Sequence, residues 1–197
     1  MKKQFLMIFV ISFILSAFNI SVAQAADNDS YQSSSSKDAS HRNTDAVMND
    51  QAIESKAKDA ISSLSFYDDS HIVMVSYNGR LVVLGQVPSK EAVKQVNEAL
   101  AQVADVREVV SELQVGEPTS FTTRSNDTLI TTKVKSALLT HKDLKSTSFK
   151  VVTENGNVYL MGLVADNQAK EASKVARSVS GVNKVVLFTE SANLAND

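Results

Sequence analysis

The chain has 197 residues, of which 43% are hydrophobic and 21% charged, and its formal net charge is −2. This composition is typical of one or two small globular domains, and the charge is too small to indicate a nucleic-acid partner. Because the sequence contains no cysteine, it offers no disulfide framework, no thiolate site and no residue for N-terminal lipid modification. We therefore expect that the protein is not a lipoprotein.

Residues 1–25 are predicted to be a signal peptide. Lysines at positions 2 and 3 form a basic start, an apolar stretch follows at residues 5–18, and the sequence A-Q-A at residues 23–25 supplies small residues for cleavage. Since the apolar stretch is shorter than the ~20 residues that a spanning helix needs, cleavage after Ala25 is favoured over an uncleaved anchor. The prediction is export to the periplasm.

A polar leader and the first helix come next. Residues 26–48 include four consecutive serines and are predicted to be disordered, because they cannot bury enough apolar surface to offset the entropy of ordering. Asn49 and Asp50 are candidate N-caps. Apolar residues then recur at the spacing of one helix face, as expected for an amphipathic helix: Ile53, Ala57, Ala60, Ile61 and Leu64.

A β-hairpin is predicted at the centre of each half of the chain. Residues 72–87 read IVMVSYNGRLVVLGQV and residues 149–164 read FKVVTENGNVYLMGLV. Asn-Gly between two apolar runs is typical of a type I′ turn, in which both central residues need positive φ. The marker glycines of the two stretches are each 77 positions apart, so the chain carries two copies of one domain. The predicted structural turn residues are Asn78, Gly79, Gly85, Asn155, Gly156 and Gly162.

A second helix and a last strand follow each hairpin. The predicted order is therefore α-β-β-α-β twice, an α+β fold with two tandem domains, each a small three-stranded mixed sheet backed by two helices. The predicted domains are residues 49–115 and 125–190. A Gly- and Pro-containing linker at residues 116–124 separates them, and residues 191–197 are expected to form a flexible tail.

This arrangement resembles the BON domain, a family found in bacterial envelope proteins. The resemblance rests on the Asn-Gly hairpin, the Gly-x-Val that follows it and the pattern V-x-G-V-x-x-V at residues 179–185, and it covers residues 49–190. The stretch SNDTLITTKVK at residues 125–135 is similar to tandem BON proteins of the outer membrane. That similarity implies peripheral binding of anionic phospholipid through the first helix of the second domain. It also implies a role in outer-membrane and envelope integrity, with the outer-membrane protein assembly machinery as a candidate partner.

The first helices of the two repeats differ on their polar side. At about 100° per residue, Leu129 and Leu139 fall outside the apolar stripe, and their counterparts in the first repeat are Ala52 and Ser62. An exposed apolar residue surrounded by lysine and hydroxyl groups is typical of an interfacial membrane contact. The alternative is an ordinary surface leucine, or one packed on the first domain. The predicted lipid-binding residues are Leu129, Thr132, Lys133, Ser136 and Leu139.

The predicted strand at residues 157–163 is apolar on both faces. Tyr159, Met161 and Leu163 point away from the side that carries Val158 and Leu160. Coverage of this outer face by the other repeat or by the linker is favoured over a ligand groove. An open face would instead suit a rival function, that of a soluble periplasmic protein of osmotic stress with chaperone-like binding of exported clients.

The sequence contains no pattern typical of catalysis or metal binding. His41, His71 and His141 are scattered, and neither H-x-x-H nor G-x-S-x-G spacing occurs. The pair Asp68-Asp69 is more typical of a turn than of an acid–base dyad, and no glycine-rich loop precedes a helix in a phosphate-binding arrangement. We expect no enzymatic activity, no metal and no cofactor.

Overall fold

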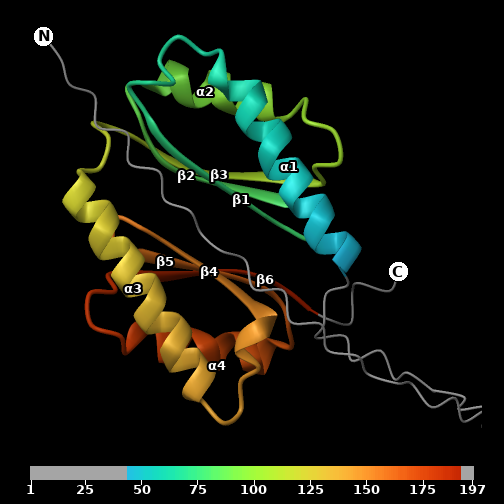
Figure 1. Ribbon diagram of the computed structural model, residues 1–197, viewed down its shortest axis with the longest axis vertical. Helices are drawn as coiled ribbons and strands as arrows, with labels where there is room; N and C mark the ends of the chain where they lie inside the picture. Colours follow the sequence, from blue (N-terminus) through green and yellow to red (C-terminus); the bar gives the residue numbers. More distant parts are fainter. Residues whose placement is uncertain (1–43, 192–197) are drawn as a thin grey trace, which may run out of the picture. The chain divides into compact units, whose positions relative to one another are not determined.

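The computed structural model describes residues 44–191. The predicted signal peptide, most of the polar leader and residues 192–197 of the tail lie outside the described residues. The first repeat comprises α1 (Thr44–Ser62), β1 (His71–Tyr77), β2 (Arg80–Val87), α2 (Lys90–Leu100) and β3 (Glu108–Val115). The second comprises α3 (Phe121–Thr140), the 3₁₀ turn η1 (Ser146–Ser148), β4 (Phe149–Glu154), β5 (Asn157–Leu163), α4 (Asp166–Arg177) and β6 (Lys184–Glu190) (Figure 1).

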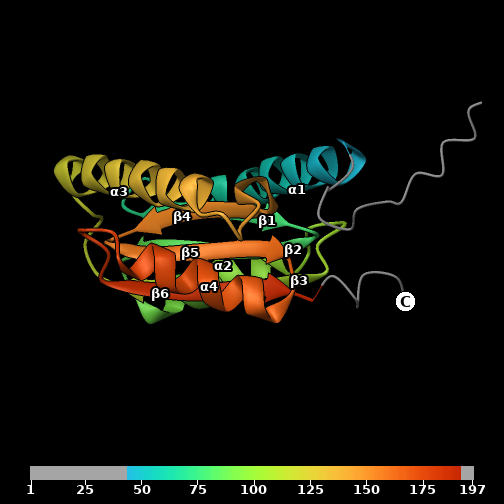
Figure 2. The same ribbon diagram turned by 90° about the horizontal axis from the view of Figure 1, so that it is seen from below.

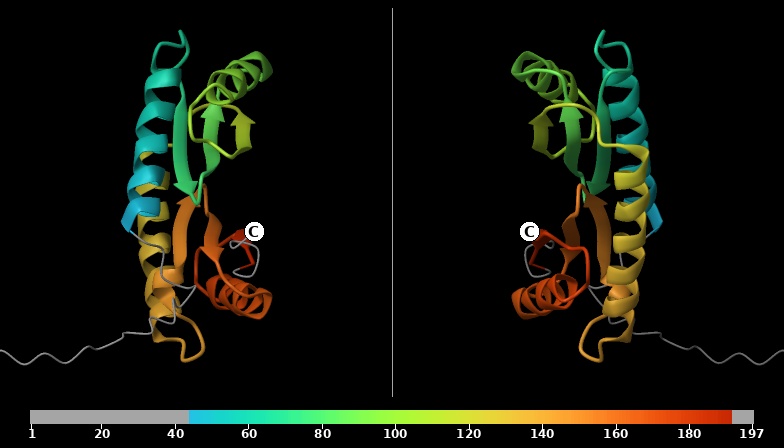
Figure 3. Two further views of the ribbon diagram at one scale, coloured as in Figure 1. Left: turned by 90° about the vertical axis from the view of Figure 1, so that its right-hand side faces the viewer. Right: turned by 90° about the vertical axis from the view of Figure 1, so that its left-hand side faces the viewer.

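Each repeat forms one mixed three-stranded sheet, as predicted. The strand orders are β1-β2-β3 and β4-β5-β6. The first two strands of each sheet pair antiparallel, and the third lies parallel to the second. Both helices of a repeat cover the same face of its sheet (Figures 1 and 3), because α2 and α4 are the crossovers that return the chain for a parallel strand. The predicted α+β fold with two tandem domains is confirmed.

The two Asn-Gly turns have the geometry that their sequence favours. The φ angles are 54° and 76° at Asn78 and Gly79, and 50° and 73° at Asn155 and Gly156. These positive values are those of a type I′ turn, whose twist matches that of the strands it joins.

Gly85 and Gly162 do not lie in turns, contrary to the prediction, but inside β2 and β5. A Cβ atom at Gly85 would lie 1.9 Å from the carbonyl oxygen of His71, and one at Gly162 would lie 2.8 Å from that of Ser148. Glycine is required at both positions because the chain that enters the neighbouring edge strand passes too close for any side chain.

Both first helices begin earlier than predicted. Helix α1 starts at Thr44, inside the predicted leader, so Asn49 and Asp50 lie within the helix and are not its N-caps. Helix α3 starts at Phe121, inside the predicted linker, and the Ser120 side chain accepts a hydrogen bond from the backbone N–H of Thr123 at 3.1 Å. The opening turns of both helices are mostly solvent-exposed. They therefore carry no apolar stripe from which the periodicity could be recognised.

The two sheets pack on each other through their helix-free faces. One apolar cluster joins residues of the first repeat with Tyr159 and Met161 of the second, which are 4% and 0% exposed. Figure 1 shows the helices on the outer sides of the two sheets, and Figure 2 shows α1 and α3 along one side of the molecule. The first repeat contributes Val75, Tyr77, Val82 and Leu84 to the fully buried part of this cluster. The favoured interpretation, coverage by the other repeat, is therefore correct. The face that carries Tyr159, Met161 and Leu163 is therefore covered in the structure and is not an open surface.

Candidate functional site

The outward side of α3 carries all five residues predicted to bind lipid. Leu129 is 58% exposed and Leu139 is 70% exposed, and Thr132, Lys133 and Ser136 are exposed between them. The opposite side of the helix holds it on the sheet through Ile130, Val134 and Leu138, each at most 1% exposed. The apolar stripe therefore anchors α3, and its polar side is left with two large apolar side chains in solvent.

Phe121 is a third exposed apolar residue on α3, and it was not predicted. Its side chain is 78% exposed. It lies eighteen residues before Leu139, which is five full turns, so the two residues lie along one line of the helix, about 27 Å apart. The early start of α3 brings Phe121 onto this side. Phe121 was not predicted because it falls within residues 116–124, which were assigned to the linker.

The charge on α3 favours an anionic partner. The helix contains three basic residues and one acidic residue, for a net charge of +2, and the acidic residue, Asp127, is buried. Within residues 44–191, Arg124, Lys133 and Lys135 form no ion pair in the structure. The counterpart helix α1 has four acidic and two basic residues, a net charge of −2, so the two first helices carry opposite charge.

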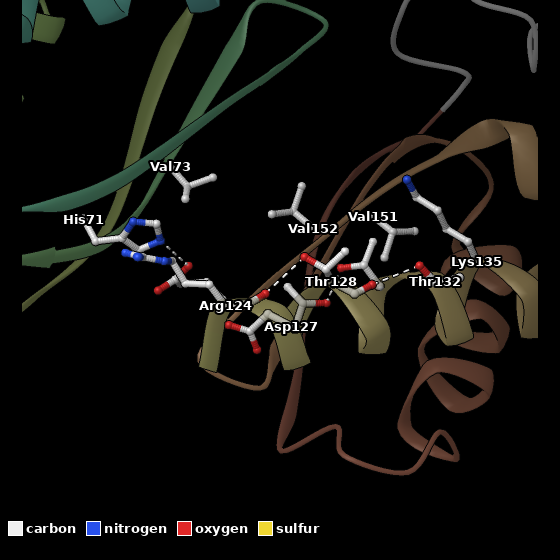
Figure 4. Close-up of a pocket in the computed structure, with 12 residues that line it drawn as sticks. His71, Val73, Arg124, Asp127, Thr128, Thr132, Lys135, Val151 and Val152 are labelled. Atoms are coloured by element: carbon white, nitrogen blue, oxygen red, sulfur yellow. Dashed lines mark hydrogen bonds and ion pairs between the residues drawn. The ribbon is translucent and has the colours of Figure 1, made fainter. Parts of the chain in front are cut away.

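A groove runs along α3 where the helix faces β4. It consists of two adjoining cavities of about 450 and 330 Å³ that share Thr132, Lys135 and Val151. We call it the α3–β4 groove. In Figure 4, His71 and Arg124 lie at one end of the larger cavity and Lys135 at the other. The smaller cavity continues from there to Leu139, so the groove opens beside the predicted lipid-binding residues.

A buried carboxylate closes the His71 end of the groove. Glu154 is buried at the end of β4. Its Oε2 lies 3.2 Å from Nε2 of His71, and its Oε1 accepts a hydrogen bond from Nε2 of Gln86 at 3.0 Å. These contacts link β4 of the second repeat to β1 and β2 of the first. The carboxylate therefore contributes to the contact between the repeats.

An aspartate at the equivalent position of each first helix fixes that helix to the hairpin of its repeat, and this role was not predicted from the sequence. Asp127 of α3 accepts backbone hydrogen bonds from Asn155 and Gly156, both at 2.8 Å. Asp50 of α1 accepts the same pair from its own turn at 2.9 Å, together with the Ser76 hydroxyl at 2.6 Å. Both carboxylates are buried. A signal was available, because the same acidic residue recurs at the repeat distance of 77 positions.

The described residues show neither a metal site nor a membrane span. Among residues 44–191, no group of three or more histidine or acidic side chains is arranged to hold an ion. In the same part of the chain, none of the helices combines the length and the apolar character needed to cross a bilayer.

Comparison with known proteins places these features in a family. The model of the BON domain matches residues 49–117 and 126–187. The chain is 39% identical over 147 residues to the outer membrane lipoprotein DolP of Haemophilus influenzae, covering 74% of this chain and 76% of that protein. It is 37% identical over 142 residues to a 21 kDa hemolysin of Actinobacillus pleuropneumoniae, covering 72% and 71%. A shorter match, 48% identical over 61 residues and 30% of each chain, is to the osmotically-inducible protein Y of Escherichia coli.

Proposed function

Because this chain belongs to the BON domain family and carries two BON domains in tandem, we propose that it is a non-enzymatic protein of the bacterial periplasm. In this proposal it binds anionic phospholipid peripherally, through the outward side of α3, and supports the integrity of the outer membrane. The name of one relative, an outer membrane lipoprotein, supports a place in the cell envelope.

One observation carries the proposal: α3 exposes three large apolar side chains on a helix of net positive charge. Phe121, Leu129 and Leu139 are each more than half exposed. An amphipathic helix with apolar residues and lysines on its solvent side is typical of a protein that lies in the interface of a membrane. At the equivalent positions, α1 has Thr44, Ala52 and Ser62, so the fold itself does not require these apolar residues.

The contact is expected to be weak and reversible. Each buried leucine contributes at most ~1.5–3 kcal/mol, and each lysine near an anionic surface contributes about 1 kcal/mol. These contributions correspond to dissociation constants between about micromolar and millimolar. Salt weakens such binding because the exposed charges are screened. Attachment to another envelope protein, such as the outer-membrane assembly machinery, would raise the affinity by holding α3 near the membrane.

The rival function, a stress protein that binds exported clients, has less support. Its expected surface around Met161 is covered by the first repeat. The similarity to the osmotically-inducible protein extends over only 30% of the chain.

The test is an NMR titration of the protein from Ala26 onward with phosphatidylglycerol micelles, with phosphatidylcholine micelles as the control. Signals of α3 between Phe121 and Leu139 are expected to shift with the anionic lipid only. Leu129→Asp should abolish these shifts. The matched control is Ala52→Asp, which places the same charge at the equivalent position of α1 and should leave the shifts unchanged.

Two outcomes would overturn the proposal. One is the absence of shifts at millimolar anionic lipid. The other is an equal loss of binding in the α1 and α3 variants, which would mean that the position on α3 has no special role. Circular dichroism of both variants checks that each remains folded.

A further inference from the structure

The α3–β4 groove is more apolar than the threonine-rich sequence of α3 indicates. Thr128 and Thr132 donate their hydroxyl hydrogens to backbone carbonyls of their own helix, at 3.1 and 3.0 Å. Thr131 donates to the hydroxyl of Thr153 at 2.7 Å. Since these hydroxyl hydrogens are used within the protein, they offer a ligand no donor. Apolar side chains also line both cavities, with Val73, Val151 and Val152 at the larger one (Figure 4) and Phe149 and Val151 at the smaller one. Val151 belongs to the core beneath α3, whereas Val73 and Val152 also belong to the cluster between the two sheets.

The charges that remain available at the groove are positive. Asp127 is occupied by the Asn155-Gly156 turn, and Glu154 by Gln86 and His71. Arg124 and Lys135, by contrast, have no ion-pair partner in the described part of the chain. The groove therefore combines an apolar floor with a cation at one end and a second along its rim.

The length of the groove suits one hydrocarbon chain. From Arg124 to Leu139, α3 rises about 22 Å. One leaflet of a bilayer, half of the hydrocarbon core, is about 15 Å thick. The far end of the groove opens at Leu139, and its lining includes Thr132 and Ser136, so it is continuous with the surface proposed above to meet the membrane.

The first repeat has the equivalent groove but with different chemistry. A cavity of about 480 Å³ lies between α1 and β1, lined by Gln51, Glu54, Ser55 and Lys58, the counterparts of Thr128, Thr131, Thr132 and Lys135. Glu54 brings a carboxylate to the position of Thr131. This carboxylate is paired with Lys150 at 2.7 Å, so the α1 groove has an internal ion pair at the position where the α3–β4 groove has a threonine.

We propose that the α3–β4 groove takes a single acyl chain of an anionic lipid, with the headgroup at Arg124 and the chain lying over Val151 toward Leu139. This inference rests on the proposed function, and it deepens that function by naming the part of the lipid that is recognised. Helix α3 would then bind individual lipid molecules as well as lie on a surface of many.

The experiment uses myristoyl-lysophosphatidylglycerol below its critical micelle concentration, with myristoyl-lysophosphatidylcholine as the neutral control. Methyl NMR signals of Val151 and Val152 are expected to shift and to saturate with the anionic monomer. Both valines line the larger cavity and lie on β4, not on α3, so binding to the outward side of α3 alone would not shift them. Shortening the chain by one methylene should weaken binding about fourfold.

Two variants separate the groove from the rest of the helix. Thr128→Trp fills the groove and is expected to weaken monomer binding at least about tenfold, since several methylenes lose their burial. Gln51→Trp is the matched control in the α1 groove and should have no effect. Arg124→Gln should remove the preference for the anionic over the neutral monomer.

The outcomes distinguish this inference from the proposed function. If phosphatidylglycerol vesicles bind while the Val151 and Val152 methyl signals do not move, the groove proposal is overturned and surface binding stands. If wild-type protein binds no anionic vesicles, the proposed function fails, and the monomer titration still decides whether the groove is a site. Equal losses in Thr128→Trp and Gln51→Trp would also overturn the groove proposal.

Discussion

Helices α1 and α3 occupy the same position in two copies of one fold. Their residues are similar only on the side that packs on the rest of the repeat. Ile53 and Ile130 are buried at equivalent positions, and so are Asp50 and Asp127. On the outward side, threonine, alanine and serine of α1 stand where α3 has phenylalanine and two leucines. The net charge changes from −2 to +2. Packing constrained the inner positions of both helices, and the outer positions were free to take on different roles.

The charges of the two helices are also used differently. Glu54 of α1 contacts Lys150 of β4 at 2.7 Å, and Lys56 contacts Asp105 at 2.7 Å. Part of the charge on α1 therefore contributes to contacts within the protein, and one of these contacts joins the two repeats. On α3, Lys133 and Lys135 remain unpaired within residues 44–191. The first helix helps to assemble the tandem, and the second is available for a partner.

The largest expected effect on stability comes from replacing the buried aspartate that both helices share. Asp127→Ala leaves two buried backbone donors without an acceptor, which should lower the free energy of unfolding by about 2–4 kcal/mol. Asp50→Ala should cost more, because Asp50 also accepts from Ser76. Urea denaturation measures both values, with Asp59→Ala on the exposed side of α1 as the control. A loss below about 0.5 kcal/mol in Asp127→Ala would show that the turn does not depend on this carboxylate.

The stability of the protein at alkaline pH should report on the burial of Tyr159 between the two sheets. Burial, with smaller contributions from Glu112 and Glu154, raises the pKa of Tyr159 from 10.0 to about 12. The equivalent residue of the first repeat is Val82, which does not ionise. Below pH 10 the tyrosine is protonated in both the folded and the unfolded chain, so its ionisation does not change the free energy of unfolding. Between pH 10 and about 12 the unfolded chain releases its proton first, so the free energy of unfolding should fall, by about 2–3 kcal/mol at the upper limit.

Tyr159→Phe isolates this contribution. The difference in unfolding free energy between wild type and variant should be constant below pH 10 and should shift in favour of the variant as pH rises toward 12. Parallel denaturation curves at all pH values would show that the tyrosine ionises equally easily in both states.

Introducing the exposed apolar residues of α3 at the equivalent positions of α1 should increase binding to lipid vesicles without creating a preference for anionic lipid. The triple variant Thr44→Phe, Ala52→Leu and Ser62→Leu is expected to bind phosphatidylcholine vesicles about tenfold more tightly than wild type, since apolar area becomes available for burial. The gain on phosphatidylglycerol vesicles should be smaller, because α1 is acidic. Vesicle co-sedimentation measures both. An equal gain on the two lipids would mean that helix charge does not select the lipid.

The smallest effect concerns one of the ion pairs between the repeats, the pair of Lys150 and Glu54. Lys150→Met removes the partner of Glu54, and both side chains are partly exposed, so the free energy of unfolding should fall by at most about 1 kcal/mol. Salt screens such a pair, so the difference from wild type should decrease in concentrated sodium chloride. A difference that is unchanged by salt would indicate that the variant acts through packing instead.

The parts of the fold that local sequence determines were predictable. Asn-Gly between apolar runs led directly to both hairpins, and the repeat distance of 77 led to two domains of one topology. The exposure of Leu129 followed from helical periodicity alone. By contrast, the starts of α1 and α3 depend on polar turns that bury little, so no periodic pattern marked them. Phe121 was missed for the same reason.

Other features depend on residues far apart in the chain. Asp127 contacts a turn 28 residues away, and an aspartate near a helix start is equally typical of an N-cap. The apolar groove could not be anticipated either. Thr128 and Thr132 are polar residues in the sequence. Only the structure shows that their hydroxyl groups donate hydrogen bonds to backbone carbonyls of α3.

The covered faces of the two sheets make this tandem comparable to a dimer whose subunits are joined covalently. Each sheet has helices on one face only, and the other face is closed by its neighbour in the same chain. A repeat produced alone would expose that face, and a second copy is the surface best matched to cover it. Residues 116–120 thus replace a concentration-dependent association with an intramolecular one, and the pairing persists however dilute the protein becomes.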